Sequence, residues 1–305
     1  MPAHSTVGRW TIALALAGFV AVSVAQVTNI IVARANAGAI PPFSIAFFRW
    51  SIVAAGLLPF VWRELSARRH VLLSQGWFVV LAGFCGMFVC GGPVYIAGVS
   101  TTAINIALIF ALSPIVVLVV SWLTGLERIG RFQLLGIVLA LTGALLIILR
   151  GAQASLMSGD TAKGDLLVVL AMLGWSGYTL LQSRVAPGAS LLARISLFSA
   201  AGALFSLPLA IREMWLTPEQ VFSTKALAAC VFAGLVPGLI AYAGFAWLGA
   251  KFGSVRTSLV LYIGPVASAL LSFAILGEPP TIIHFFGGLL ILGGVWASLR
   301  GKGAA

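Results

Sequence analysis

The sequence predicts an all-α integral membrane protein with ten transmembrane helices, arranged as two inverted repeats of five helices each. Three observations carry this prediction: the composition, the spacing of the apolar segments and an internal repeat. Of 305 residues, 61% are hydrophobic and 8% are charged, whereas roughly 25% of a soluble domain is charged. A chain of this size cannot hide so much apolar surface from water, so lipid must surround most of it.

The apolar segments have the length and spacing of membrane-crossing helices. A helix needs about 20 predominantly apolar residues to cross the hydrocarbon layer of a bilayer. On that criterion we expect spans at residues 10–33, 43–62, 76–98, 102–124, 130–149, 165–186, 191–211, 226–249, 254–276 and 281–299. The first run continues to Ile31 without an evident small-residue cleavage site, so we expect a retained helix rather than a signal peptide.

Short connectors rich in charge, glycine or proline separate the expected spans. They comprise Gly38 with Pro41 and Pro42, the charged patch 64–70, residues 125–130, the polar stretch 155–164, Pro187 with Gly188, and Glu278 with Pro279 and Pro280. Proline lacks an N–H and glycine is conformationally free, so both residue types end helices. The two remaining connectors, at 98–102 and 249–254, are tight.

The basic residues indicate which way the helices run. If the chain starts inside, the inner connectors hold Arg9, Arg63, Arg68, Arg69, Arg128, Arg131, Arg184, Arg194, Lys251, Arg256, Arg300 and Lys302, and the outer connectors hold Arg34, Arg150, Lys163, Arg212 and Lys225. The acidic residues Asp160, Asp165, Glu213, Glu219 and Glu278 also fall on the outer side. The positive-inside rule therefore predicts a multi-pass protein of a bacterial-type inner membrane, with both termini in the cytoplasm.

Rare residues recur at a separation of 151 positions. Without a gap, Pro114 meets Pro265, Ser121 meets Ser272, Glu127 meets Glu278, Gly136 meets Gly287 and Gly143 meets Gly294. Each repeat holds an odd number of spans, so equivalent helices cross in opposite directions, as in inverted-repeat transporters. We assign residues 1–150 to the first repeat and 151–305 to the second. The glycine pairs give the fifth and tenth helices one smooth face each. We expect these two helices to pack closely against each other.

The same register carries a resemblance to a known family. Its marks are Ser113-Pro114 and Gly264-Pro265, a Glu thirteen residues after each of these prolines, a glycine-rich last helix in each repeat, Phe48-Arg49-Trp50 and Gly174-Trp175-Ser176. Together they resemble the drug/metabolite transporter superfamily, and more narrowly the EamA-type ten-helix exporters, including the amino-acid and aromatic-amino-acid exporters. The resemblance implies export of small amphipathic metabolites, most of all neutral and aromatic amino acids, by alternating access through a central cavity.

Polar and aromatic side chains within the spans are the candidates for binding the solute, because such groups are costly in hydrocarbon and tend to face cavities. The substrate-binding candidates are Trp175, Tyr95, Tyr178, Tyr242, Ser258, Tyr262 and Arg49. Other polar residues of the spans include Gln26, Asn29, Asn105, Gln182 and His284. The resemblance places the third, sixth, eighth and ninth spans around the cavity. Aromatic walls suit an amphipathic solute and attract an ammonium group; packing or an interfacial belt is the alternative.

Arg49 has no counterpart in the second repeat, because Phe198 takes the equivalent position when Pro59 is laid on Pro208. Its guanidinium could pair with a substrate carboxylate. The alternative is that the side chain extends to the outer interface, or bonds backbone carbonyls there.

The energy source follows from what the sequence lacks. No Asp or Glu falls in the middle of an expected span, so there is no carboxylate relay of the kind that pumps use. No GxxxxGK[ST] motif occurs, so ATP does not drive the process. We expect movement down the solute's own gradient without a cofactor or an obligatory ion-coupling site. Proton exchange at Glu127 or Glu278, or coupling through a histidine, is the alternative.

Other classes of protein fit less well. His4, His70 and His284 are scattered and the three cysteines lack zinc spacing, so we expect no metal site and no intramembrane enzyme. Basic residues do not alternate with aromatics in stripes, which argues against nucleic acid as a partner. Rings of charge typical of a channel are also missing. The partners expected are a small-molecule solute and the lipid bilayer; no oligomeric state is indicated. A drug or nucleotide-sugar carrier of the same superfamily is the main alternative.

Overall fold

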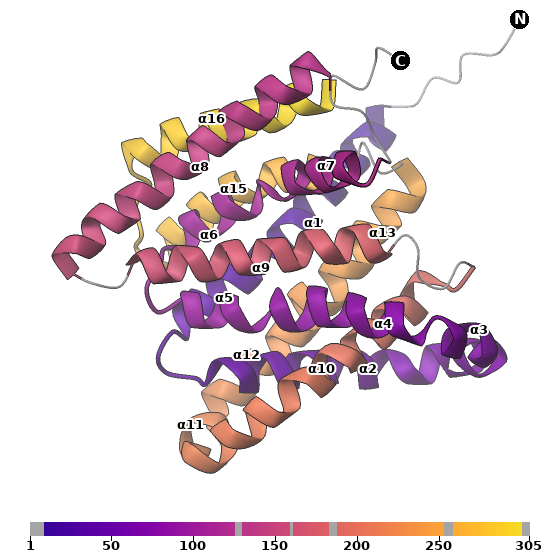
Figure 1. Cartoon of the computed structure of the whole chain (residues 1–305). Coiled ribbons are helices and arrows are strands. Elements are labelled where there is room, and N and C mark those ends of the chain that lie inside the picture. Colours follow the sequence, from indigo (N-terminus) through magenta and orange to yellow (C-terminus); the bar gives the residue numbers. More distant parts are fainter. Residues whose placement is uncertain (1–8, 126–129, 159–160, 183–187, 253–258, 301–305) are drawn as a thin grey trace, which may run out of the picture.

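The computed structural model of the chain describes residues 9–125, 130–158, 161–182, 188–252 and 259–300, and within these ranges the regular structure is entirely helical (Figure 1). In chain order the elements are α1 (Arg9–Ala35), α2 (Pro42–Ala67), α3 (Arg69–Ser74), α4 (Gly76–Gly83), η1 (Phe84–Val89), α5 (Gly92–Ala97), α6 (Ala103–Phe110), α7 (Ser113–Leu123), α8 (Arg131–Ser158), α9 (Thr161–Gln182), α10 (Leu191–Leu216), α11 (Pro218–Val221), α12 (Thr224–Ala233), η2 (Gly234–Ile240), α13 (Ala241–Phe252), α15 (Leu259–Leu271), η3 (Ser272–Leu276) and α16 (Ile282–Arg300). The elements marked η are π-helical.

Seven helical stretches of the described chain are long and apolar enough to cross a membrane. They are 17–35, 42–67, 76–97, 103–123, 163–182, 191–216 and 224–245, and they coincide with seven of the expected spans. At the other three expected spans lie shorter apolar helices, Arg131–Ile147, Ile263–Leu276 and Ile282–Gly294. The chain is therefore a multi-pass helical membrane protein.

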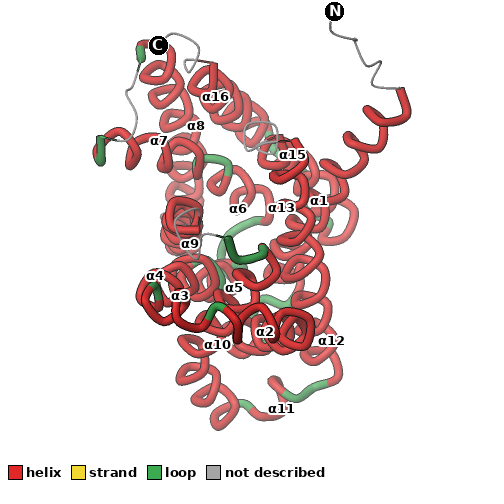
Figure 2. Tube along the Cα trace, turned by 90° about the vertical axis from the view of Figure 1, so that its right-hand side faces the viewer, coloured by secondary structure: helices red, strands yellow, loops and turns green. Residues whose placement is uncertain are grey.

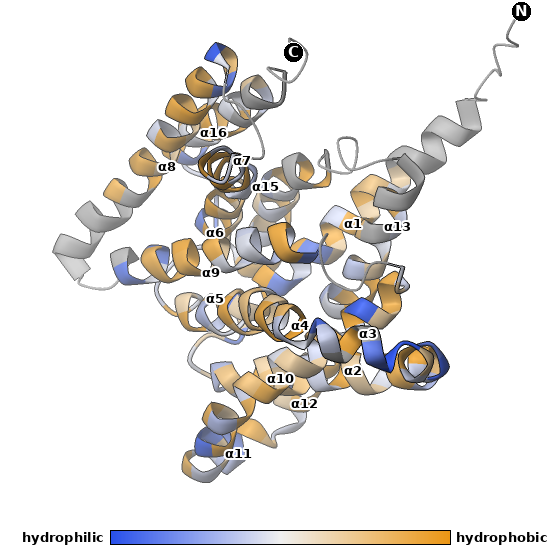
Figure 3. Ribbon diagram, turned by 45° about the vertical axis from the view of Figure 1, so that its right-hand side comes forward, coloured by the Kyte–Doolittle hydropathy of each residue, from blue (hydrophilic) through white to orange (hydrophobic). Residues whose placement is uncertain are grey.

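The bundle has two polar ends. Figure 1 shows α3 and α11 at opposite ends of the molecule, with consecutive long segments running in alternating directions between them. Hydrophilic residues gather at α3 and α11, whereas hydrophobic residues cover the lengths of the helices (Figure 3). We call these two ends the α3 end and the α11 end. Our orientation prediction places the α3 end in the cytoplasm.

Several helices are shorter or less regular than the hydropathy pattern predicts. The fourth expected span is interrupted at Ala111 and Leu112, and α7 restarts with Pro114 in its first turn, where a missing N–H costs no hydrogen bond. In the third and eighth spans, η1 and η2 interrupt the α-helix. Pro237 lies inside η2 and cannot donate to the helical ladder, which accounts for the irregular turn there.

Helices α8 and α16 lie side by side along one edge of the bundle (Figures 1 and 2). A Cβ at Gly143 would lie 2.6 Å from the carbonyl oxygen of Gly287, and a Cβ at Gly294 would lie 2.5 Å from that of Gly136. No residue larger than glycine fits these positions without a shift. The expectation that the fifth and tenth helices pack against each other through these glycines is confirmed.

Helices α2 and α10 form a second long pair. Pro41 and Pro42 have no N–H, so the first backbone donors of α2 are Phe43 and Ser44, and both donate to the carboxylate of Glu213 on α10, at 3.2 and 2.7 Å. At the other end of the pair, the N–H of Ser190, the N-cap of α10, donates to Glu64 on α2. A carboxylate at the positive N-terminal end of a helix is stabilising, so Glu213 stabilises the start of α2 and Glu64 stabilises the start of α10.

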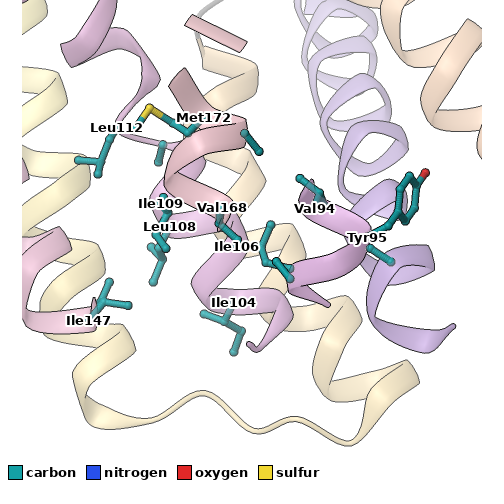
Figure 4. Packing of buried hydrophobic residues seen from close by; sticks show 14 of the residues in the cluster. Val94, Tyr95, Ile104, Ile106, Leu108, Ile109, Leu112, Ile147, Val168 and Met172 are labelled. Carbon is teal, nitrogen blue, oxygen red and sulfur yellow. The ribbon is translucent and has the colours of Figure 1, made fainter. Parts of the chain in front are cut away.

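The largest apolar cluster of the described residues lies among α5, α6, α7 and α9 and extends to α1, α2, α8, α12 and α16. Val94, Ile106, Ile109, Val168 and Met172 are among its members (Figure 4). Tyr95 lies at its edge, with its hydroxyl turned away from the cluster (Figure 4). This core fixes α5, α6 and α9 as one wall beside the candidate site.

Candidate solute cavity

A cavity of about 130 Å³ lies between elements from both the first and the second half of the chain. Its wall includes Gln26, Asn29 and Ile30 of α1, Arg49 and Trp50 of α2, Gly86 of η1, Ala107 and Phe110 of α6, Trp175 of α9, Pro237 of η2, Tyr242 of α13, and Gly264 and Pro265 of α15. The wall is mostly apolar with a few convergent polar groups, which is typical of small-molecule sites.

Arg49 supplies the positive charge of this cavity, and three elements hold it in place. Its Nη1 donates to Oδ1 of Asn29 and, at 3.2 Å, to the hydroxyl of Tyr95. The Tyr95 hydroxyl in turn donates to the same Asn29 oxygen at 2.7 Å. Nη2 lies 3.5 Å from the carbonyl oxygen of Pro237, and Nε is buried without a partner. The Nη1 group of the guanidinium is thus fully bonded, whereas the edge formed by Nε and Nη2 is not.

Trp50 closes one face of the guanidinium. Its ring centroid lies 4.2 Å from Cζ of Arg49, a cation–π arrangement. The indole is fixed because its Nε1 donates to the carbonyl oxygen of Met87 at 2.9 Å. Trp50 and Arg49 are adjacent in sequence, so their orientations are set together by the first turns of α2.

An aromatic cluster continues from Trp50 across the cavity. Tyr242 meets Trp50 edge to face at 5.6 Å and Trp175 at 5.7 Å, measured between ring centroids. Trp175 lies 5.4 Å from Tyr178, which packs on Phe198 at 5.6 Å. A smaller cavity of about 20 Å³ lies beyond Trp175 and Tyr242, lined also by Gln182 and Leu191. These two rings therefore stand between the two cavities.

The structure distributes the predicted site residues unevenly. Arg49, Trp175 and Tyr242 line the central cavity, whereas Tyr178 lines the smaller one. Tyr95 lies behind the wall and acts through its bonds to Arg49 and Asn29. Ser258 and the side chain of Tyr262 lie outside the described residues. The interpretation in which Arg49 extends to the outer interface is wrong, because its side chain is enclosed and only 3% exposed.

The sequence gives no signal for a second buried charged residue, Asp165. It lies near the start of α9 and is 0% exposed. Thr101 Oγ1 donates to its carboxylate, and Asn105 Nδ2 lies 3.2 and 3.3 Å from its two oxygens. Gly164 permits this burial, because a Cβ there would lie 2.5 Å from Ser100 Oγ. Although Asp165 lies near the start of a helix, next to a connector, it is enclosed by protein.

His284 extends this chain of bonds. The backbone N–H of Thr281 donates to its Nδ1 at 3.0 Å, so the Nε2, 2.9 Å from Asn105 Oδ1, is the donor in that contact. Asn105 thereby connects the imidazole to Asp165. His284, one of the polar residues found in the expected spans, thus makes a contact between α16 and α6.

At the α11 end, Glu278 joins elements that are far apart in sequence. Its Oε1 accepts from Nε of Arg34 at the end of α1, and its Oε2 accepts from the N–H of Ala103 at the start of α6 at 3.1 Å. Nη1 of Arg34 donates to the carbonyl oxygen of Gly98 at 2.8 Å. We call this set of contacts the Arg34–Glu278 interlock. It ties the connector after η3 to α1, α5 and α6.

A multi-pass helical bundle with a cavity between its two halves is the arrangement found in many membrane transporters. The EamA-like transporter family matches the chain twice, over residues 10–149 and 162–300. The chain belongs to the EamA-like transporter family and is a membrane transporter of the drug/metabolite type.

Relatives agree with this assignment. "Uncharacterized transporter YetK" of Bacillus subtilis (strain 168) is 25% identical over 280 residues, covering 90% of this chain and 83% of that protein. An "Uncharacterized transporter" of Archaeoglobus fulgidus is 30% identical over 217 residues, covering 68% of this chain and 70% of that protein. "WAT1-related protein At4g08290" of Arabidopsis thaliana is 25% identical over 292 residues, covering 86% of this chain and 75% of that protein.

A solved structure, "Crystal structure of protein", supports the fold. It matches with a TM-score of 0.63 and 23% identity, over 94% of this chain and 97% of that one. At this identity the likeness shows a shared fold.

Proposed function

We propose that this chain exports small amphipathic metabolites, with neutral and aromatic amino acids as the solutes that fit best. The observation that carries the proposal is the central cavity, which Arg49, Trp175 and Tyr242 line together. A carboxylate suits the guanidinium. An apolar or aromatic side chain suits the rings, and an ammonium group is attracted to their faces.

The proposed mechanism is alternating access between two inverted halves, residues 1–150 and 151–305, with ten spans and both termini in the cytoplasm. Support comes from the 151-residue register and from the family match that occurs once in each half. It also comes from the two helix pairs, α2 with α10 and α8 with α16, since each pairs equivalent helices of the two halves. In such transporters the solute site lies between the repeats.

Two sets of contacts are proposed to control access. The Arg34–Glu278 interlock closes the α11 end, because it bonds Glu278 of the second half to α1 and α6 of the first. Trp175 and Tyr242 separate the central cavity from the smaller one. The π-helical turns η1 and η2 and the proline inside α15 lie in elements that line the cavity, and such irregular turns are common at functional sites.

Transport down the solute's own gradient, without an obligatory coupling ion, is the proposed energetics. The second candidate is proton-coupled carriage of the same solutes, or of drugs or nucleotide sugars. A specific observation favours it: Asp165 is a fully enclosed carboxylate at the end of a hydrogen-bonded chain that reaches His284. Buried ionisable groups of this kind mark proton pathways in other membrane proteins.

The test of the solute class is competition in proteoliposomes. Purified protein is reconstituted, and uptake of radiolabelled phenylalanine is measured with an excess of unlabelled amino acids, nucleotide sugars or lipophilic cations. We expect amino acids with neutral or aromatic side chains to compete and the other two classes not to. The absence of saturable phenylalanine uptake, or uptake that nucleotide sugars or lipophilic cations inhibit and other amino acids do not, would contradict the proposal.

A further inference from the structure

We propose that the central cavity is a carboxylate receptor: Arg49 binds the carboxylate of the solute through its Nε–Nη2 edge, and the site does not require an ammonium group on the solute. This inference rests on the proposed function, because it assumes that the solute occupies this cavity. It narrows the substrate class from amphipathic metabolites in general to organic carboxylates with an apolar or aromatic body.

The guanidinium of Arg49 is only partly bonded. An arginine offers five N–H donors in a rigid plane. The Nη1 group serves Asn29 and Tyr95, but Nε has no acceptor, and Nη2 has only the Pro237 carbonyl at 3.5 Å, the outer limit for a hydrogen bond. Nε and Nη2 lie on the same edge of the guanidinium, and their N–H bonds are parallel. This edge is the one that a carboxylate engages through two oxygens.

Leaving this edge unbonded is costly. A buried donor without an acceptor is destabilising, more so when it belongs to a charged group. Arginine does not lose its proton in a protein, so Arg49 cannot relieve the cost by becoming neutral. The enclosed, unpartnered Nε of a cavity-lining residue therefore points to an acceptor that the chain does not itself provide.

The wall of the cavity lacks a negative charge to balance Arg49. None of the described residues that line the cavity is acidic, and the described ion pairs, Arg34–Glu278 and Glu64–Arg68, do not include Arg49. Trp50 offers its ring face to the cation, which offsets part of the burial cost and holds the guanidinium plane. A bound carboxylate would supply the missing negative charge.

Gly238 packs beside the free edge. A Cβ at Gly238 would lie 3.6 Å from Nε of Arg49, 2.9 Å from Cγ2 of Val53 and 3.0 Å from the carbonyl oxygen of Ala233. A side chain at this position would therefore crowd α2 and lie against the free edge. The Pro237 carbonyl is the group that a carboxylate would replace at Nη2, and its bond is already long. Binding therefore exchanges one weak contact for two charged ones.

The polar groups of the wall also explain why an ammonium group is not required. Among the described lining residues an ammonium would find no carboxylate, and Oδ1 of Asn29 already accepts from Arg49 and Tyr95. Aromatic faces and the amide of Gln26 remain, but a second positive charge would also be repelled by Arg49. The carboxylate, not the ammonium, is then the recognised group.

The experiment compares three ligands that share one ring. Equilibrium binding of radiolabelled phenylalanine, 3-phenylpropionate (no ammonium) and 2-phenylethylamine (no carboxylate) is measured on the purified full chain. We expect both carboxylates to bind, within about tenfold of each other, and the amine to bind at least tenfold more weakly. A charged, two-oxygen contact corresponds to an effect of about ten- to a hundredfold.

Variants assign the effect to Arg49. Arg49→Gln should weaken 3-phenylpropionate binding at least tenfold, and Arg49→Lys, which keeps the charge but not the planar edge, should give an intermediate loss. Arg212→Gln, which removes an exposed arginine of α10 away from the cavity, is the matched control and should bind normally. Melting curves of each variant show whether it is folded, and the wild-type ligand series stands even if Arg49→Gln does not fold.

The outcomes separate the receptor from the proposed function on which it rests. Binding of the amine but of neither carboxylate overturns the receptor and leaves a transporter of cations. Binding of both carboxylates that is equal in wild type, Arg49→Gln and Arg49→Lys overturns the role of Arg49. Binding of none of the three ligands to the folded wild-type chain contradicts both the receptor and the proposed solute class.

Discussion

Glu64 and Glu213 bind the starts of each other's helices. Each lies 22 residues after the first residue of its own helix, Pro42 for α2 and Leu191 for α10. Glu213 accepts from the first free N–H groups of α2, and Glu64 accepts from the N–H of Ser190, which caps α10. The two helices run antiparallel with equivalent residues at opposite ends. This reciprocity is what the proposed inverted repeat would produce in the α2–α10 pair.

The two capping contacts differ in strength, which gives a stability prediction. Glu213 accepts from two N–H groups of α2 and from the hydroxyl of Ser44 at 2.8 Å. Among the described residues, Glu64 bonds only Ser190 of α10, pairs with Arg68 of its own segment at 3.9 Å and lies at a more exposed end. Glu213→Gln should lower the free energy of unfolding by about 1–2 kcal/mol, since it removes charge from several hydrogen bonds at a helix start. Glu64→Gln should lower the free energy of unfolding by a smaller amount. Unfolding in detergent, followed by circular dichroism, measures both; an equal or reversed order would contradict this difference in strength.

The glycines of α8 and α16 offer a test with an internal control. Gly143→Ala and Gly294→Ala place a methyl within 2.6 and 2.5 Å of backbone oxygens, so the helices must separate. We expect a loss of about 1–3 kcal/mol for each, as for other overpacked interfaces. Gly293→Ala meets nothing within 4 Å and should leave the unfolding transition unchanged or slightly raise it. The same loss in all three variants would show that the cause is not the contact between α8 and α16.

Much of this architecture is predictable from the sequence because hydropathy and small-residue spacing are local properties. The apolar runs place the helices, and the spacing of Gly136, Gly143, Gly287 and Gly294 predicts the close contact between α8 and α16. Arg49 and Trp175 stand out because they are polar or amphipathic within apolar spans. Both line the cavity.

The remaining features depend on contacts between distant segments. From the sequence, Asp165 would be a solvated acidic residue beside a connector. In the structure, Gly164 allows the connector between α5 and α6 to pack against α9, and Thr101 of that connector binds Asp165. The bonds among Asn29, Arg49 and Tyr95 join three helices, and no pattern along the chain relates them. Hydropathy also does not predict the π-helical turns, because such turns change the direction of side chains and not their polarity.

The Arg34–Glu278 interlock predicts a conformational effect. Glu278→Gln and Arg34→Gln weaken the contacts that hold the α11 end together, so conformations open at that end should gain population. Ser23→Cys, on the cavity wall, in a background with Cys85, Cys90 and Cys230 replaced by Ala, reports the change. We expect a small, membrane-impermeant thiol reagent added on the α11 side to react several-fold faster. Arg212→Gln is the control and should leave the labelling rate of Ser23→Cys unchanged. The same unchanged rate in Glu278→Gln and Arg34→Gln would contradict the role of the Arg34–Glu278 interlock in closing the α11 end.

Trp175 is the residue of the cavity whose loss should affect transport most. Trp175→Ala removes the ring that contacts Tyr242 and separates the two cavities, so we expect at least a tenfold loss of flux with normal expression. Trp215→Ala is the matched control, because that ring is 83% exposed on α10 and lines neither cavity. Flux near wild type in a folded Trp175→Ala protein would remove this residue from the site.

Phenylalanine flux down its own gradient, without an imposed pH or ion gradient, tests the proposed transport most directly. Proteoliposomes loaded with radiolabelled phenylalanine are diluted into solute-free buffer at equal pH and salt, with a protonophore present. We predict saturable efflux that exceeds that of protein-free liposomes, that Asp165→Asn leaves largely unchanged and that Trp175→Ala abolishes. Efflux that disappears when the pH difference is collapsed, and that returns when a pH difference is imposed on wild type but not on Asp165→Asn, would contradict this proposal and identify a proton-coupled carrier.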